Sequence, residues 1–275
     1  EFLAAMLYAE GKQGEKERIG SSRIFRGKRQ FTPEYIYVFV SELIATAKYD
    51  TIGSLLFRQS LKMPGLAEVY AAFLQRLKRR FPGRDAYMEK ILLCLCCTEN
   101  GLTEKELVSL AGHMDKDILF FIYPYLEVTG EQRMLVRSSA FCRAIFLAWK
   151  IKREQVYLCR KHIVETCFLD AEEDPILGRE LLHQLQYLQD EKITAKVMGN
   201  LQIVDSILYY DEEYAYTRLR KLQDFPKYLQ SWSEWEVTEN NHACMLTVIN
   251  LEIENDMLEN AERHLQEMLS LLEQG

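Results

Sequence analysis

The sequence predicts a mainly α-helical protein, in which a helical lid and a winged helix precede the start of an α-solenoid. Apolar residues recur at helical spacing along most of the 275 residues. Residues that cap helices precede several of these stretches. One stretch, 127–136, alternates instead around Thr129-Gly130, as expected for a β-hairpin. We therefore expect a lid at 1–82, a winged helix at 83–150, a helical linker at 151–235 and the start of helical repeats at 236–275.

The lid is expected to begin with a polar, basic loop over 11–30 and to continue as two helices. Thr32 can cap the first helix, and Pro33 suits its first position, where the missing N–H would be unpaired. Its predicted buried face holds Ile36, Val40, Leu43 and Ala47. The second helix covers 66–81, and its predicted buried residues are Leu66, Val69, Tyr70, Phe73, Leu74 and Leu77. The basic residues in its last turn complement the helix dipole and need no ligand.

The winged helix is expected to begin with a helix over 86–97. Thr103 and Glu106 have the spacing of a capping box for the second helix, which Gly112 ends. Asp115 can cap a third helix, whose aromatic and aliphatic residues from 118 to 123 we expect to be buried. After the hairpin, Ser138 or Ser139 begins a helix that runs to Trp149.

Helices are predicted throughout the remainder of the chain. An acidic turn at 170–175 separates a helix over 156–169 from one over 177–188, and a helix over 193–198 follows. Trp232 and Trp235 are expected to pack between helices. In the last helix, 255–273, one face carries Leu258, Ala261, Leu265, Met268, Leu269 and Leu272. Such spacing is typical of stacked helix pairs, so we expect repeats to continue beyond Gly275.

Composition and side-chain chemistry restrict the function. A net charge of −7 argues against general nucleic-acid binding, and the longest apolar run, Ile91 to Cys97, is too short to span a membrane. Without a signal peptide, we expect a cytoplasmic protein with no membrane contact. The chain begins at Glu1 without Met, and both ends look cut from a longer protein.

Neither a metal site nor a catalytic residue is predicted. Cys94 and Cys97 form a C-x-x-C, but no second such pair exists to complete four zinc ligands. We expect the seven cysteines to be core or surface residues. The five histidines have no partner at a recognisable motif spacing, and we expect them to be half-buried or on helix surfaces.

Four phrases, in order, resemble the signal-transducing P-loop ATPases with numerous domains (the STAND class, with its NACHT and NB-ARC branches), above all the nephrocystin-like and telomerase-associated proteins with tetratricopeptide repeats. Residues 32–43 resemble the "N-P-L-Y-L…E-E-L" phrase of the lid. Residues 101–110 resemble "G-L-T-E-x-E-L". Residues 138–145 stand where many relatives have "x-H-x-x-x-R-x-A-V", and the stretch from Arg179 to His183 partly matches "R-x-x-E-L-x-x-H".

The resemblance implies that Pro33 packs against the adenine of a nucleotide, with Tyr35 as its companion. Ser139 stands nearest the family's phosphate-sensing histidine. The chain has no G-x-x-x-x-G-K-[ST] motif, so we expect no enzymatic activity and no cofactor in this chain itself. ATP or ADP would be held by a P-loop domain of the same parent chain. Residues 236–275 would then begin tetratricopeptide-like repeats.

The resemblance thus implies a regulatory and scaffold region that couples nucleotide state to protein partners bound by the repeats. Two other functions stay open. One is a DNA-binding winged-helix regulator with a helical tail, although the predicted recognition helix offers few side chains for base edges. The other is an all-helical protein-interaction adaptor. Pro33 itself also has a purely structural explanation as the first residue of a helix.

Overall fold

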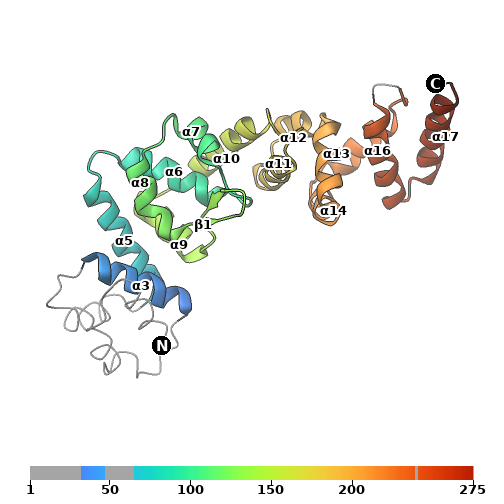
Figure 1. Ribbon diagram of the computed structural model, residues 1–275. Helices are drawn as coiled ribbons and strands as arrows, with labels where there is room; N and C mark the ends of the chain where they lie inside the picture. Colours follow the sequence, from blue (N-terminus) through green and yellow to red (C-terminus); the bar gives the residue numbers. More distant parts are fainter. Residues whose placement is uncertain (1–31, 47–64, 239–240, 275) are drawn as a thin grey trace. The chain divides into compact units, whose positions relative to one another are not determined.

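A computed structural model describes residues 32–46, 65–238 and 241–274 of the chain (Figure 1). Fourteen α-helices and two short strands make up this part, which confirms the mainly α-helical class. None of the helices in these residues is long and apolar enough to cross a membrane. The helices are α3 (Pro33–Thr46), α5 (Leu66–Arg80), α6 (Asp85–Cys97), α7 (Glu104–Ala111), α8 (Lys116–Ile122), α9 (Ser139–Trp149), α10 (Arg153–Cys167), α11 (Pro175–Leu188), α12 (Glu191–Met198), α13 (Leu201–Tyr210), α14 (Glu212–Leu219), α15 (Phe225–Ser233), α16 (His242–Glu254) and α17 (Leu258–Gln274).

The described chain forms two compact units. Unit 1 holds the described residues up to Cys96 together with 113–129 and 134–153. Unit 2 holds 97–112, 130–133 and the residues from Glu154 onward. The segment 83–150 contributes to both units. The winged helix, the solenoid and the four domain boundaries stay predictions.

In unit 1, α5 packs against both α3 and α9. Five of the six residues predicted to line its buried face are buried: Val69, Tyr70, Phe73, Leu74 and Leu77. The ring of Phe73 lies 3.8 Å from that of Tyr125 and 5.8 Å from that of Phe141, so aromatic contacts fill the space between the helices. At the end of α5, Lys78 donates a hydrogen bond to the carbonyl of Ala148 at 2.9 Å.

The face that α3 turns to α5 differs from the predicted one. Val40 is buried as expected, but Ile36 is half-buried, and Tyr35, Val38 and Phe39 are buried instead. The side chains of Leu43 and Ala47 lie outside the described residues, as does the predicted loop at 11–30. The buried face of α3 therefore lies about one position before the predicted one.

The predicted hairpin is confirmed within unit 1. Strands β1 (Glu127–Val128) and β2 (Met134–Leu135) are antiparallel, with Glu127 opposite Leu135. The backbone N–H of Val136 then donates to the carbonyl of Leu95 in α6 at 3.0 Å. This bond and the buried side chains of β2 hold the hairpin against α6.

The third predicted helix, α8, begins as expected, since the side chain of Asp115 accepts a hydrogen bond from the backbone of Ile118. The expectation that its apolar residues are all buried is wrong. Phe120 is 83% exposed and Tyr123 is 46% exposed. A seven-residue helix that packs on one side leaves its other side open, whatever residues that side carries.

In unit 2, α7 has both hydrogen bonds of the predicted capping box, from Glu106 N–H to Thr103 and from Thr103 N–H to Glu106. Gly112 ends α7 in the left-handed conformation, with φ of 91°. The buried guanidinium of Arg133 lies 2.8 Å from a carboxylate oxygen of Glu106 and also donates to the carbonyl of Gly101. This buried ion pair fixes α7 to the tip of the hairpin loop.

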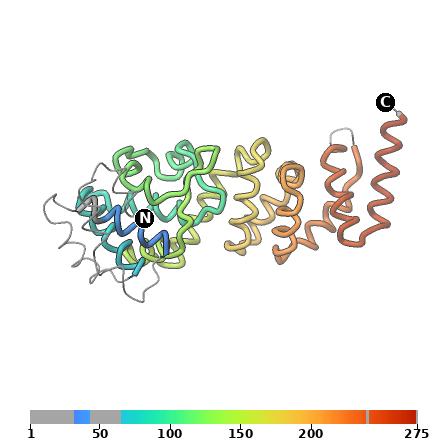
Figure 2. Tube along the Cα trace, turned by 60° about the horizontal axis from the view of Figure 1, so that its bottom comes forward, coloured from blue at the N-terminus to red at the C-terminus, as the bar shows by residue number. Residues whose placement is uncertain are grey.

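The later helices of unit 2 contact neighbours that are close along the chain, so that α11 packs against α13 and α14, and α13 against α16 (Figure 2). A Cβ atom at Gly178 would come within 2.6 Å of Ile207, so glycine allows the close approach of α11 and α13. Trp232 is buried and Trp235 half-buried. In α17, Ala261 is buried against α16, whereas Leu258, Leu265, Leu269 and Leu272 are exposed.

Candidate functional site

The predicted nucleotide-facing residues lie in unit 1, at the starts of two helices. Pro33 is the first residue of α3 and is exposed. Tyr35 is buried, and its ring stacks on Phe39 with centroids 5.5 Å apart, so it belongs to the packed face of α3. Ser139 is the first residue of α9 and is exposed, while its neighbour Ser138 caps that helix by accepting from the Phe141 N–H.

Tyr70 of α5 joins these two helix starts. Its hydroxyl donates to the Glu34 carboxylate at 2.7 Å and lies close enough to the Ser138 side chain for that group to act on its pKa. Because Ser138 accepts from a backbone N–H, its own proton is available to the Tyr70 oxygen. Pro33 directly precedes Glu34, and Ser139 directly follows Ser138. The Tyr70 hydroxyl therefore links two sites that are more than a hundred residues apart in the sequence.

Burial raises the pKa of Tyr70, and the nearby Glu34 carboxylate raises it further against the opposing hydrogen bond from Ser138. The hydroxyl therefore stays protonated at physiological pH and can donate throughout. The ring of Tyr70 stacks on Phe141 at 4.6 Å. With its ring packed and its hydroxyl placed between Glu34 and Ser138, Tyr70 can hold the two helix starts in a fixed register, but it supplies no reacting group.

A second cluster of polar side chains lies in unit 2, around the turn at Glu99 and Asn100. Glu180 of α11 is fully buried, and one of its oxygens accepts from the backbone N–H groups of Glu99 at 3.1 Å and Asn100 at 2.8 Å. The Asn100 side chain donates to the same oxygen at 3.1 Å. The other carboxylate oxygen accepts from Gln184 at 2.5 Å. The buried carboxylate thus orders the turn that leads into α7.

The side chain of Glu99 has three partners of its own. Its carboxylate accepts from Arg218 and, at 2.8 Å, from the Tyr214 hydroxyl, both of α14. His183 Nδ1 lies 3.1 Å from the same carboxylate. The pKa of Glu99 is lowered to about 2, first by the interaction with His183 and then by Tyr214 and Arg218, against the opposing effect of burial. Glu99 is therefore charged at physiological pH.

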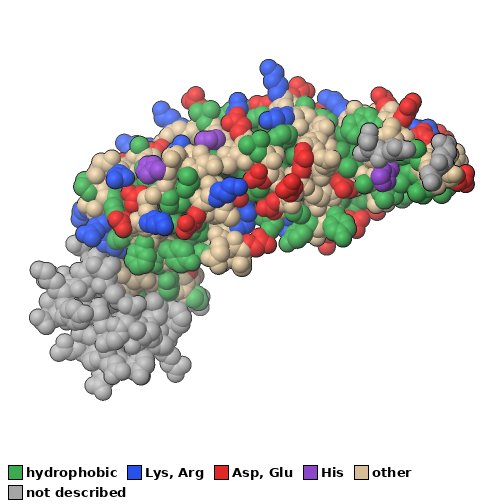
Figure 3. Space-filling model, turned by 45° about the horizontal axis from the view of Figure 1, so that its top comes forward, with side chains coloured by type: hydrophobic (Ala, Val, Ile, Leu, Met, Phe, Trp, Pro, Cys, Tyr) green, Lys and Arg blue, Asp and Glu red, His purple; other side chains and the backbone are tan. Residues whose placement is uncertain are grey.

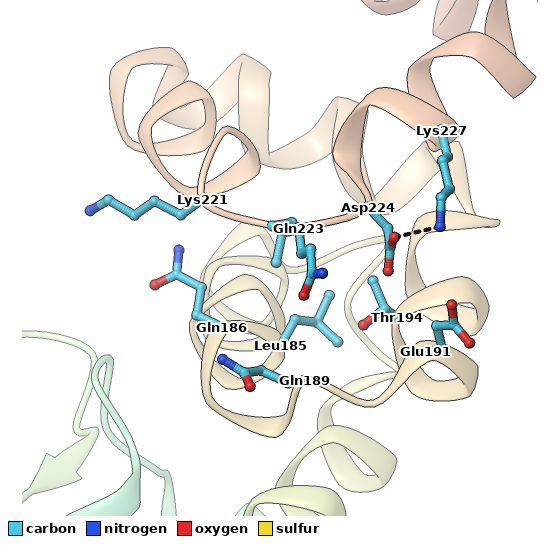
Figure 4. Close-up of a pocket in the computed structure, with 10 residues that line it drawn as sticks. Leu185, Gln186, Gln189, Glu191, Thr194, Lys221, Gln223, Asp224 and Lys227 are labelled. Carbon is cyan, nitrogen blue, oxygen red and sulfur yellow. Dashed lines mark hydrogen bonds and ion pairs between the residues drawn. The ribbon is translucent and has the colours of Figure 1, made fainter.

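A pocket of about 520 Å³ lies beside this cluster, between α11, α12 and the turn that follows α14 (Figure 4). Gln186 lines it from α11, Gln189 from the position directly after that helix, and Thr194 from α12. Arg218 Nη1, which belongs to the guanidinium that holds Glu99, also donates to Gln186 at 2.7 Å. Gln189 ends α11 with φ of 48°, in the left-handed region. The pocket wall and the Glu99 cluster therefore share one arginine.

The charges of this pocket are mixed. Lys227 is already paired with Asp224 at 2.7 Å, as the dashed line in Figure 4 shows. Lys221 and Glu191 lie at opposite sides of the opening and add one charge of each sign. The pocket wall carries positive charges, negative charges and several amides. It therefore suits a polar group of no particular charge and does not indicate a class of ligand.

Two histidines have carboxylate neighbours that their sequence spacing did not reveal. His183 faces Glu99, and His264 Nδ1 lies 3.0 Å from Glu252 while its Nε2 lies 3.0 Å from the Trp235 carbonyl. His264 and Glu252 are both fully buried, so the expectation of a half-buried or surface histidine is wrong there. The two ring nitrogens of His264 join α17 to α16 and to the segment after α15.

Sequence reasoning missed Glu99, Glu180, Tyr214 and Arg218. A signal did exist for Glu180, which sits four residues before Gln184 within an otherwise leucine-rich helix. A charged residue inside an apolar stretch points to a buried polar contact. Glu99 gave no such signal, because its partners in α14 lie more than a hundred residues away.

No model of a protein family, no curated protein and no solved structure matches the chain. Within the described residues, no group of three or more histidine, cysteine or acidic side chains is placed to hold a metal ion. The cysteines of the described residues form no disulfide with one another, and Cys94, Cys97 and Cys167 are buried.

Proposed function

We propose that the chain is a regulatory and scaffold region of a STAND-type ATPase, which couples the nucleotide state of a P-loop domain to protein partners of a helical repeat array. The observation that carries the proposal is the shared contact at Tyr70. The resemblance assigns Pro33 to adenine and Ser139 to the phosphate-sensing place, and these residues flank Glu34 and Ser138, which the Tyr70 hydroxyl joins. Two segments with related roles are thus held together in unit 1.

In this proposal Pro33 and Ser139 meet the nucleotide, and Tyr70 is a positioning residue. Both helix starts are exposed, so a ligand held by another domain could reach them. The N-terminus of a helix also carries partial positive charge, which suits the approach of a phosphate to the start of α9. The chain would be one half of a two-state packing that the nucleotide biases.

Unit 2 would transmit the nucleotide-dependent change in packing to protein partners. The Glu180 carboxylate and the Glu99 cluster fix the turn before α7 to α11 and α14. The segment from Arg179 to His183, which the resemblance singled out, supplies Glu180 and His183 to these contacts. We propose that it acts as a structural clasp that makes this part of unit 2 move as one body.

The DNA-binding alternative gains no support from the exposed face of α8. That face carries Lys116, Asp117 and Phe120. It would therefore offer DNA phosphates a single positive charge beside a negative one, which does not favour binding.

The test measures ADP binding to the polypeptide that carries the P-loop domain together with this chain. Tyr70→Phe removes both hydroxyl contacts and keeps the packed ring, and we expect it to weaken ADP binding by roughly 3- to 10-fold, as losing about 1 kcal/mol of positioning predicts. Pro33→Ala should weaken it too. The matched control is Tyr157→Phe, which removes an exposed tyrosine–carboxylate bond to Asp190.

Equal ADP affinities of the wild type and Tyr70→Phe would contradict the proposal. So would ATP hydrolysis by residues 1–275 alone, because the proposal places the phosphate-binding loop in another domain. A change in thermal stability without a change in ADP affinity would leave Tyr70 a purely structural residue and also contradict its role.

A further inference from the structure

A second groove in unit 2 has a more definite chemistry than the pocket beside the Glu99 cluster. It holds about 390 Å³ and lies between α13, α14 and α16; we call it the α13–α16 groove. Asp205 and Tyr209 line it from α13, Glu212 and Tyr216 from α14, and Leu246 and Asn250 from α16. On each helix these residues are four apart, so each pair stands on one face and points into the groove.

The walls of the groove expose apolar side chains to solvent. Tyr209 is 95% exposed and Leu246 is 50% exposed. Covering such surface with a partner is favourable by about 25 cal/mol per Å² of apolar area. Aromatic and aliphatic groups that meet in a concave site are typical of binding surfaces. The exposed amide of Asn250 can bond to the backbone of an occupant.

The charge of the groove selects the occupant. Its lining carries the carboxylates of Asp205 and Glu212 and no lysine or arginine. Asp205 accepts a hydrogen bond from Thr247, which holds its carboxylate in place. Arg220 lies 5.8 Å from the Tyr216 ring and is paired with Glu254 at 3.2 Å. An incoming cation would therefore meet two carboxylates that no described basic side chain neutralises.

The surrounding sequence strengthens this selection. Residues 201–275 carry fifteen acidic and five basic side chains, whereas residues 1–200 carry twenty-six acidic and twenty-nine basic ones. Four of the five basic side chains are paired with carboxylates: Arg218, Arg220, Lys227 and Arg263. Figure 3 shows acidic side chains, in red, interspersed with apolar ones, in green. The field around the groove attracts a basic partner and repels nucleic acids and acidic membranes.

We propose that the α13–α16 groove binds a protein segment in which lysine or arginine stands next to leucine or an aromatic residue. The cation lies between Asp205 and Glu212, and the apolar side chain lies against Tyr209 and Leu246. The proposal specifies the partner surface of the proposed function and rests on it for the role of this binding in signalling. Binding itself needs no nucleotide.

The test uses fluorescence anisotropy on residues 1–275 with a labelled peptide of alternating arginine and leucine. Two further peptides replace arginine by glutamate or leucine by serine. Glu212→Gln and Asp205→Asn should each weaken binding by about 2- to 5-fold at low salt, as expected for an exposed ion pair. Leu246→Ala should weaken it by roughly 3- to 10-fold, as expected for a half-covered leucine.

Each variant has a matched control. Glu213→Gln removes the neighbouring charge in the same first turn of α14, and Leu258→Ala removes an exposed leucine of α17. Neither residue lines the groove, and both controls should bind like the wild type.

The proposal is overturned if the glutamate–leucine peptide binds as well as the arginine–leucine peptide, or if the groove variants bind like their controls. Equal binding of the arginine–serine peptide would also overturn it, since charge alone would then suffice. None of these outcomes bears on ADP affinity, so the groove can fail while the nucleotide proposal stands, and the reverse holds too.

Discussion

Replacing Glu180 by glutamine is the sharpest test of how unit 2 is held together. The glutamate is fully buried, and one oxygen accepts three N–H donors from Glu99 and Asn100. The other oxygen faces the amide of Gln184 at 2.5 Å. Glutamine keeps the shape of the side chain, but it turns one of these acceptors into an NH₂ group. Whichever way the new amide lies, it points a donor at a donor.

The magnitude follows from the contacts. Hydrogen bonds to a charged group contribute about 1.5 to 3 kcal/mol each, and an unpaired buried donor costs about 1 to 3 kcal/mol. Gln184 cannot turn its oxygen toward position 180 without cost, because that oxygen accepts from Arg160 at 2.8 Å. We expect Glu180→Gln to lower the free energy of unfolding of unit 2 by roughly 2 to 4 kcal/mol.

The assay is urea unfolding followed by tryptophan fluorescence, since Trp232 and Trp235 both lie in unit 2. Glu165→Gln on the exposed side of α10 is the control and should stay within about 0.5 kcal/mol of the wild type. If Glu180→Gln also stays within that range, the buried carboxylate does not order the turn, and the clasp assigned to the segment around it is refuted.

Three further predictions concern single residues. Because the pKa of Glu99 is lowered to about 2, its contribution to stability is complete above pH 4.5 and is lost as the pH falls toward 2. Its carboxylate is one-third exposed, so after allowance for solvent screening we expect about 1 to 2 kcal/mol, measured as a gap between wild type and Glu99→Gln that closes at acid pH; a constant gap from pH 7 to pH 3 would refute it. Thr103→Ala removes one bond of the capping box and should cost about 1 kcal/mol in thermal or urea unfolding, and a neutral result would disprove the role of the cap. Phe120→Ser should change stability by less than about 0.5 kcal/mol, since the side chain is 83% exposed; a large loss would show that the ring is covered.

Elements that depend on neighbours within four residues could be predicted from the sequence. Thr103 with Glu106, Asp115 before α8 and Ser138 before α9 each satisfy a backbone N–H a few positions away. Such local bonds leave a pattern in the sequence itself. The hairpin and those helices for which the sequence predicted bounds therefore lie close to the expected positions, whereas α13 to α16 were expected only as part of a helical stretch.

Burial and long-range partners could not be predicted in the same way. Apolar character did not show that Phe120 faces solvent, because a short helix has more apolar positions than its packed side can cover. Arg133 with Glu106 and Glu99 with Arg218 depend on how the chain folds back over many residues. For the candidate site, the sequence indicated Pro33 and Ser139, while Tyr70, which joins their neighbours, was expected only as a core residue.

Gln189 places two demands on one position. It ends α11 in the left-handed conformation, where a residue with a Cβ atom costs about 1 kcal/mol relative to glycine, and its amide also lines the pocket beside the Glu99 cluster. Glycine at this position would raise the stability of the protein, but it would also remove a hydrogen-bonding side chain from the pocket wall. A directed-evolution screen that ranks variants by heat resistance alone would thus select against the pocket's own chemistry at this residue.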